Sequence, residues 1–311
     1  MKCVTSILMT LSMLRYTKLP AQYPCAIKSG VTTVAPSAFI VATVLLESMQ
    51  ALACRSISHQ HCVLSHIYSC TPLKANISRR MDYFWRRRAI DNTGLVNSLR
   101  ENGTITTSRV AEVMEQIDRG LFVPAGVGDP YFDTPAPIGY NATISAPHMH
   151  AACLELLKDH LQPGMRALDI GSGSGYLTAI FALLVGETGR AVGVEHISEL
   201  TEKSVENVQK CNAAHLLTSD SLSLHTGDGR KGYPDLAPYD AIHVGAAAPT
   251  IPPALIEQLK PGGRMVIPVG DVFQDLVVID KDMQGEVKQW DYTQVRYVPL
   301  TDRQMQLEKE Q

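Results

Sequence analysis

The sequence predicts an α/β fold in which a doubly wound, mostly parallel seven-stranded sheet carries helices on both faces. Residues 167–175 (ALDIGSGSG) form a short apolar run that ends in glycines, and an apolar helical stretch follows at 176–185. This order indicates a buried strand, a glycine turn and a helix. Further short apolar runs alternate with helical patterns as far as residue 298, and this alternation favours a parallel sheet covered by helices.

The remaining elements follow from hydrophobic periodicity and from cap residues. Strands are expected at 167–170, 191–195, 222–226, 239–245, 264–269, 276–280 and 295–298. Helices are expected at 93–101, 108–118, 147–161, 176–185 and 252–260, with Ser145 as the N-cap ahead of Pro147. Residues 122–144 contain four prolines and are expected to form a long functional loop.

The glycine turn has the features of a cofactor-binding turn. Glycine lets the backbone approach a ligand closely, and the helix that follows presents free N–H groups to it. The spacing is G-x-G-x-G, whereas dinucleotide sites have G-x-G-x-x-G, and Asp169 would repel a phosphate. A cofactor with a positive centre and no phosphate, such as S-adenosylmethionine, therefore fits better. A tight strand–helix connection without a ligand is the alternative.

Two further acids are expected at the same edge of the sheet. Glu195 ends the next apolar run, 24 positions after Gly171, where an acid can accept hydrogen bonds from ribose hydroxyls. Asp228 follows the third run, within Gly-Asp-Gly, and could accept a hydrogen bond from an adenine amino group. Either acid could instead cap the helix that follows it.

Together these segments resemble the class I S-adenosylmethionine-dependent methyltransferases, whose sheet is Rossmann-like. Three more segments narrow the resemblance: 141–150 (NATISAPHMH), 239–249 (YDAIHVGAAAP) and 298–302 (VPLTD). Over about residues 90–305 the chain resembles the protein-L-isoaspartate (D-aspartate) O-methyltransferase family. The resemblance implies transfer of a methyl group from S-adenosylmethionine, which leaves S-adenosylhomocysteine, to the free α-carboxylate of isoaspartyl residues in damaged proteins and peptides. It leaves open whether D-aspartyl residues are accepted.

The resemblance also implies the residues of the site. Ser145 matches the family's active-site serine and is expected to hold a substrate carboxylate oxygen. His150 is expected to face the cofactor, and His148 to pack. The positions that match cofactor-binding residues of the family are Ala142, Thr143, Ile144, His150, Asp169, Gly171, Ser172, Gly173, Gly175, Glu195, His196, Asp228, Gly229, Thr301 and Gln306. No metal is expected, because the body of the chain contains no cysteine pair with metal-ligand spacing.

The first 80 residues differ from the rest in charge. They contain eight Lys and Arg and a single acid, Glu47, whereas residues 81–311 contain 20 Lys and Arg and 30 acids. Residues 1–88 are therefore expected to be an extension, either a transit segment or disordered, ahead of a catalytic domain at 89–311. Chloroplast or mitochondrial targeting is expected, with the nucleus as an alternative because of the arginines at 79–88, and the catalytic domain itself is expected in the cytoplasm.

The expected partners are proteins and peptides that contain isoaspartyl residues. A monomer is expected, and the acidic body argues against a nucleic-acid substrate held by its phosphates. The apolar run 34–46 is shorter than the ~20 residues that span a bilayer, so stable membrane insertion is not expected. Two other functions stay open: a nicotinamide oxidoreductase, against which the glycine spacing argues, and a non-catalytic binding module, against which the three acids argue.

A chain starting at Met81 tests the expected boundary. If residues 1–80 serve only to target the protein to a compartment, the shortened chain should have the same melting temperature as the full chain. Its initial rate of methylation of an isoaspartyl peptide should also be the same. The apolar run 34–46 is the reason to measure both. If it packs on the sheet, its loss exposes apolar surface at ~25 cal/mol per Å², and a drop of several degrees in melting temperature would contradict the boundary.

Overall fold

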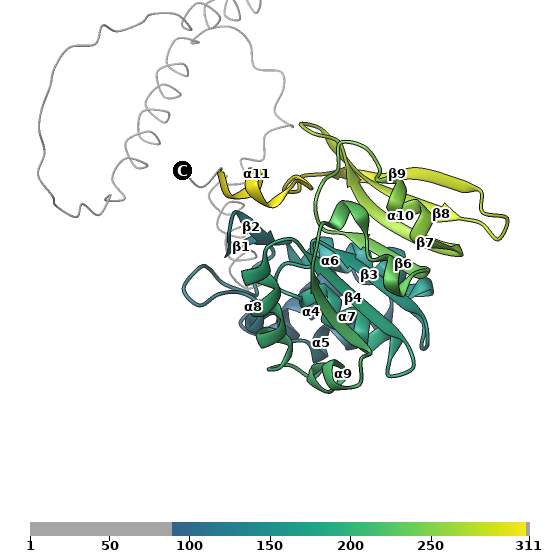
Figure 1. Cartoon of the computed structure of the whole chain (residues 1–311). Helices are drawn as coiled ribbons and strands as arrows, with labels where there is room; N and C mark the ends of the chain where they lie inside the picture. The colour runs from purple at the N-terminus through teal and green to yellow at the C-terminus, as the bar shows by residue number, and fades with distance from the viewer. Residues whose placement is uncertain (1–88, 309–311) are drawn as a thin grey trace, which may run out of the picture. The chain divides into compact units, whose positions relative to one another are not determined.

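A computed structural model of the chain describes residues 89–308, and the expectations for residues 1–88 lie outside this range. The described part consists of a central sheet with helices packed on its two faces (Figure 1). No helix within 89–308 is both long enough and apolar enough to cross a membrane.

The sheet has seven strands in the order β5-β4-β3-β6-β7-β8-β9. Strands β3 to β7 run parallel, and β8 is antiparallel to both of its neighbours. The strands are β3 (Arg166–Ile170), β4 (Arg190–Glu195), β5 (Leu222–Thr226), β6 (Tyr239–Val244), β7 (Leu259–Val269), β8 (Gln274–Lys281) and β9 (Val287–Val295). The predicted doubly wound, mostly parallel sheet is confirmed. Strand order reverses between β3 and β6, and such a reversal is where α/β sheets bind ligands.

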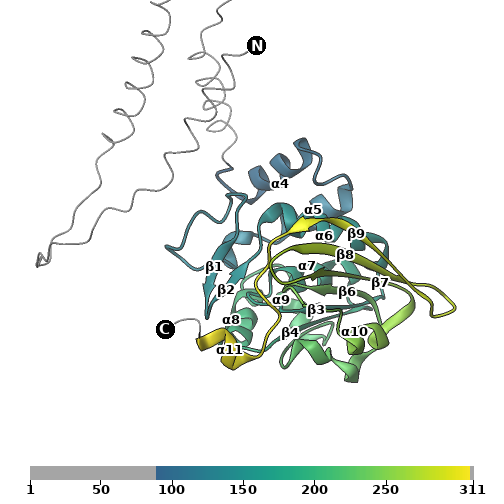
Figure 2. The same ribbon diagram turned by 90° about the horizontal axis from the view of Figure 1, so that it is seen from above.

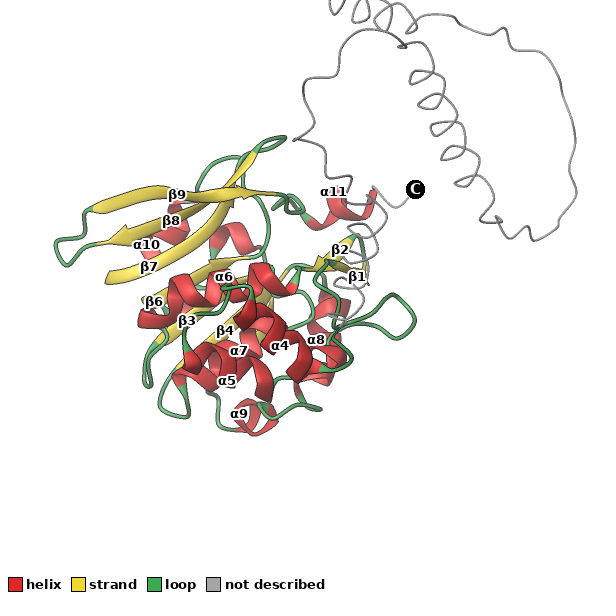
Figure 3. Ribbon diagram, turned by 180° about the vertical axis from the view of Figure 1, so that it is seen from behind, coloured by secondary structure: helices red, strands yellow, loops and turns green. Residues whose placement is uncertain are grey.

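Helices cover the two faces unequally. Figure 3 shows α4 (Asn92–Glu101), α5 (Ser108–Gln116), α6 (Pro147–Leu157) and α7 (Tyr176–Val185) in front of one face. The other face carries α10 (Pro253–Gln258), which lies across the strands from α6 when seen from above (Figure 2). The described helices also include α8 (Ser198–Val208), α9 (Ala214–Thr218) and α11 (Arg303–Glu308).

A row of alanines lets α7 approach the sheet closely. Ala167, Ala191 and Ala241 are aligned across β4, β3 and β6, and all three are fully buried on the face that α7 covers. Nine of the ten residues of α7 are buried, which its continuous apolar run predicts. On the opposite face, larger side chains such as Leu168 and Val192 form a second core. These small side chains set the distance of α7 from the sheet, and with it the position of the glycine turn at the start of α7.

Two segments differ from the sequence-based expectation. Residues 122–144 are not only loop, because β1 (Ala136–Gly139) and β2 (Ala142–Ile144) form a hairpin. Tyr140 and Asn141 form its turn with φ of 52° and 55°. Glycine usually occupies such left-handed positions, so the sequence showed no sign of this turn. The seventh strand was predicted wrongly at 295–298, and it is β9, which ends where that range begins. All but the last residue of β9 are exposed, so it lacks the apolar alternation of a half-buried strand.

Helix ends also differ from the expectation. The helix expected at 147–161 ends as α6 at Leu157 and continues as a 3₁₀ turn, Lys158–His160. Its N-cap is Ala146, and no side chain caps it, so the prediction of Ser145 as a cap was wrong. The helix expected at 252–260 is shorter because β7 begins at Leu259, which pairs with Tyr239 before a bulge.

Glu155 ties α6 to the start of α5. Its carboxylate accepts hydrogen bonds from the backbone N–H groups of Thr106 and Thr107, at 2.9 and 2.8 Å, and from both threonine hydroxyls. Burial would raise the pKa of this carboxyl, but these bonds and one from Lys158 outweigh burial and lower the pKa to about 2.

Glu155→Gln should therefore lower the free energy of unfolding at pH 7 by about 1–3 kcal/mol, the range for hydrogen bonds to a charged group. A depressed pKa stabilises the fold above the unfolded value of about 4.3, and this contribution is lost as pH falls toward 2. Urea unfolding from pH 7 to pH 3 should thus show the difference shrinking. Glu112→Gln, at an exposed position of α5, is the control. A difference independent of pH would contradict this account.

Candidate cofactor and substrate site

The glycine turn lies at the reversal of strand order. Gly171 N and Ser172 N donate to Val194 O, at 2.8 and 3.2 Å, which fixes the turn over the end of β4. Gly245 follows β6, and its N–H donates to Ile170 O at 2.7 Å. Gly173 and Gly175 have φ of 51° and 84°, which side chains disfavour. The carboxyl ends of β3, β4 and β6 thus present backbone to one pocket.

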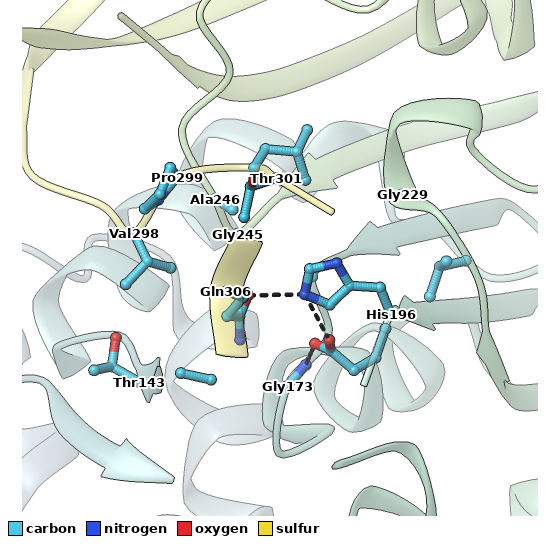
Figure 4. A pocket seen from close by; sticks show the side chains of 15 residues that line it. Thr143, Gly173, His196, Gly229, Gly245, Ala246, Val298, Pro299, Thr301 and Gln306 are labelled. Atoms are coloured by element: carbon cyan, nitrogen blue, oxygen red, sulfur yellow. Dashed lines mark hydrogen bonds and ion pairs between the residues drawn. The ribbon is translucent and has the colours of Figure 1, made fainter. Parts of the chain in front are cut away.

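This pocket, the switch-point pocket, contains most of the predicted cofactor residues (Figure 4). The predicted residues that line it are Ala142, Thr143, Gly171, Gly173, Glu195, His196, Gly229, Thr301 and Gln306. Its other lining residues are Val194, Gly245, Ala246, Val298, Pro299 and Leu300. No lysine or arginine of the described chain is among them, so a phosphate would find no cation there.

Glu195 is the acid of this pocket. Its side chain is 7% exposed, and its two oxygens accept hydrogen bonds from Gly173 N and Ile197 N, both at 3.0 Å. Each oxygen retains a second acceptor position, because a carboxylate has about four. Glu195 therefore fixes the glycine turn and can still accept hydrogen bonds from hydroxyl groups.

A C-terminal helix, α11, closes one side of the pocket. Gln306 of α11 accepts a hydrogen bond from His196 Nε2 at 2.8 Å and donates to Tyr140 O at 2.7 Å. Asn141 Nδ2 donates to Gln306 O at 2.9 Å. One side chain and its backbone therefore join α11, the β1–β2 hairpin and the end of β4 around the pocket.

A second pocket, the inner pocket, lies beneath the glycine turn. Ser145, Ile144, His150, Asp169, Ser172 and His243 are among its lining residues. Asp169 is buried, and it accepts hydrogen bonds from Thr178 Oγ1 at 2.5 Å and His243 Nδ1 at 2.8 Å. Burial opposes the charged form of His243, but hydrogen bonds with Asp169 and Cys153 outweigh it and raise the pKa of His243 to about 10. His243 is therefore an imidazolium beside Asp169.

His150 reaches the same pocket from α6 in its neutral form. Burial and the nearby cation of Arg119 lower the pKa of His150 well below its ordinary value. Arg119 is itself buried, and its Nη1 donates to His150 Nδ1 at 3.4 Å. The imidazole proton then occupies Nε2. By contrast His148, which was expected to pack, is half-exposed and contacts Asp133 at 2.9 Å, so that expectation was wrong.

A third cavity, the outer groove, opens beside Ser145 and has a volume of about 420 Å³. Its walls come from the start of α6 and from residues 294–298. Tyr297 hydrogen-bonds the side chains of Ser145 and Cys153, and burial raises the pKa of its phenol well above the ordinary value. Arg296 is exposed on the groove wall and forms no ion pair with any described residue. Sequence reasoning missed both, although they directly precede the segment 298–302.

Thr143 and Gly245 line all three cavities, so the switch-point pocket, the inner pocket and the outer groove meet there. Two predicted residues do not line any of them. Gly175 is the N-cap of α7. Asp228 is bound bidentately by Arg230, at 2.9 and 3.0 Å, and this contact lowers the pKa of its carboxyl.

Comparisons with known proteins agree with this geometry. Residues 90–305 match the family model for protein-L-isoaspartate(D-aspartate) O-methyltransferase. A protein-L-isoaspartate O-methyltransferase of Triticum aestivum is 63% identical over 229 residues, which are 73% of this chain and 99% of that protein. Protein-L-isoaspartate O-methyltransferase 1 of Arabidopsis thaliana is 58% identical over 228 residues, which are 73% of this chain and 99% of that protein.

A solved structure from Plasmodium falciparum is similar as well. It is described as a protein-L-isoaspartate O-methyltransferase and was solved in complex with S-adenosyl-L-homocysteine. The two chains superimpose with a TM-score of 0.64 at 33% identity, over 68% of this chain and 99% of that one.

The buried pair Asp169–His243 gives a double-mutant test. Asp169→Asn or His243→Gln leaves a buried partner without its counter-charge, and each should cost about 3–5 kcal/mol of unfolding free energy. The double variant should cost less than the sum of the two. His243 has a raised pKa, so the stabilisation from its charge is fully present at pH 6.5 and is lost as pH rises through about 10. Urea unfolding measures both effects, and additive single effects would contradict the pairing.

Proposed function

The chain belongs to the protein-L-isoaspartate(D-aspartate) O-methyltransferase family, and we propose that its three connected cavities hold the two substrates of the family's reaction. The enzyme methylates the free α-carboxylate of isoaspartyl residues in damaged proteins and peptides, with S-adenosylmethionine as methyl donor. The ester product can close to a succinimide and open partly to normal aspartate, which is the repair. Because the chain belongs to this family, the oxidoreductase and binding-module alternatives are discarded.

The switch-point pocket and the inner pocket fit S-adenosylmethionine. Glu195 can accept hydrogen bonds from ribose hydroxyls, and the side chains of Val194 and Leu300 offer apolar walls to a base. The absence of lysine and arginine from the described lining suits a cofactor without phosphate. In the inner pocket, His150 Nε2–H could donate a hydrogen bond to the carboxylate of the cofactor. Asp228 lines none of the three cavities, so its side chain would have to turn toward the switch-point pocket before it could accept a hydrogen bond from adenine.

The outer groove is the proposed site of the isoaspartyl residue. When bound, S-adenosylmethionine supplies an electrophilic methyl group on a sulfonium. The attacking carboxylate is ionised at neutral pH, so no side chain has to remove a proton. What this chain must supply is position and charge. Ser145 lines both the groove and the inner pocket, and Arg296 gives the groove a cation. We assign Ser145 to one carboxylate oxygen and Arg296 to attraction of the anion.

The observation that carries this proposal is the meeting of all three cavities at Thr143 and Gly245, because a methyl group must pass between adjacent sites. We also propose that the chain works as a monomer. The cytoplasm for the catalytic part, and an organelle address in residues 1–88, remain proposals that rest on composition alone.

Labelling of a matched peptide pair tests the function. With radiolabelled S-adenosylmethionine, the full chain should incorporate base-labile methyl groups into an isoaspartyl peptide and little into its aspartyl twin. The reason is that the ester of a main-chain α-carboxylate forms only where the β-linkage leaves that carboxylate free. Equal labelling of both peptides would contradict the repair assignment but would still be consistent with methyl transfer.

Gln306→Ala tests the closure of the switch-point pocket by α11. Loss of its bonds to His196 and Tyr140 should weaken S-adenosylmethionine binding by about 1 kcal/mol, roughly fivefold in Kd, and leave the melting temperature nearly unchanged. Gln304→Ala is the matched control, because Gln304 bonds Glu308 within the same helix. Titration calorimetry measures both, and equal affinities of the two variants would refute a role for Gln306.

A further inference from the structure

The turn between β7 and β8 presents two large apolar side chains to solvent. Val272 is 88% exposed and Phe273 is 85% exposed. Turn tips usually carry polar residues or glycine, whose side chains suit water. Adjacent exposed apolar side chains at such a position indicate contact with another molecule. We refer to Gly270–Phe273 as the apolar tip.

The apolar tip lies at the same edge of the sheet as the cofactor and substrate site. β7 is parallel to β6, so its carboxyl end lies beside the end of β6, which Gly245 follows. Ala248, three residues beyond Gly245, forms a bridge with Val269, the last residue of β7. The tip therefore begins directly beside the loop that lines the three cavities.

The apolar tip is also joined rigidly to the wall of the outer groove. Gln274 is buried, and its Oε1 accepts a hydrogen bond from Tyr297 N at 2.6 Å. Its Nε2 donates to Tyr297 O at 3.2 Å and to Asp271 O at 3.1 Å. Gln274 also pairs in the sheet with Val295, which lines the groove. Phe273 directly precedes Gln274, so it follows the groove-lining Val295 by one strand pairing and one residue along β8.

The shape of the turn holds both side chains outward. Gly270 has φ +124°, and a Cβ at this position would collide with the carbonyl oxygen of Phe273. Glycine is therefore required for a turn this tight. The tip is a fixed projection of the groove rim, with Val272 and Phe273 at its end.

We propose that the apolar tip contacts apolar side chains of the substrate polypeptide next to the isoaspartyl residue. This inference rests on the assignment of the outer groove to that residue. An isoaspartyl residue within a protein continues as chain on both sides, and the flanking residues must leave the groove over its rim. Extended chain advances about 3.3–3.6 Å per residue, so a flanking residue reaches the tip within a few positions. The enzyme then favours damaged segments whose apolar side chains are exposed, as they are where the substrate is unfolded.

The test compares two isoaspartyl peptides, one flanked by leucine and valine and one flanked by serine and glycine. The double variant Val272→Ser with Phe273→Ser should raise KM for the apolar peptide about tenfold, the ratio expected when part of one large apolar side chain loses its burial. The value of kcat, the KM for the polar peptide and the Kd for S-adenosylmethionine should not change. Met283→Ser is the matched control, because Met283 is 73% exposed at the turn on the opposite end of β8.

Each other outcome overturns the inference. An equal change in KM for both peptides would show a general effect on the groove, and no change would show that the tip does not touch substrate. Sedimentation of the full chain and of the double variant tests whether the apolar tip instead contacts a second copy of the chain. A dimer that the substitutions abolish would assign the tip to self-association. Failure of the unaltered enzyme to label either peptide would instead contradict the proposed function.

Discussion

A buried ion pair holds together the point where this sheet reverses its strand order. Asp169 of β3 and His243 of β6 are partners in the strand register, and their side chains meet at 2.8 Å with almost no exposure. Thr178 of α7 donates to the same carboxylate, and Cys153 of α6 contacts the imidazole. Four elements are thereby fixed around one charge pair, and the glycine turn that is proposed to bind the cofactor starts two residues after Asp169. Because a lone buried charge is costly, replacing either partner alone destabilises the fold.

The three cavities follow from this arrangement. The ends of β3 and β4 supply the glycine turn and Glu195, the loop after β6 supplies Gly245, and the β1–β2 hairpin supplies Thr143 from the other side. Methyl transfer requires the donor and the acceptor within contact distance. In the proposed arrangement, the residues shared by all three cavities mark where the sulfonium methyl and the carboxylate approach each other. The remaining walls differ in chemistry, since the switch-point pocket has no lysine or arginine in its described lining and the groove has Arg296.

Sequence reasoning found the elements whose burial leaves a one-dimensional signal. Strands β3, β4 and β6 are buried on both faces, so they appear as short, mainly apolar runs. Strand β9 is exposed and polar, and its position was predicted wrongly for that reason. The site shows the same division. Glu195 and the glycines could be predicted from spacing along the chain, whereas Arg119 acts only because folding brings it to His150, 31 positions away. No local pattern reports such a contact.

Three titratable groups near the meeting point of the cavities are each held in one protonation state around neutral pH. His150 is neutral because burial and Arg119 lower its pKa, and His243 is charged because its pKa is raised to about 10. The phenol of Tyr297 is neutral because burial raises its pKa. An enzyme that relied on general base catalysis would need a group poised to titrate near its working pH. A carboxylate nucleophile needs none, so a fixed array of donors and charges is the arrangement that this reaction can use.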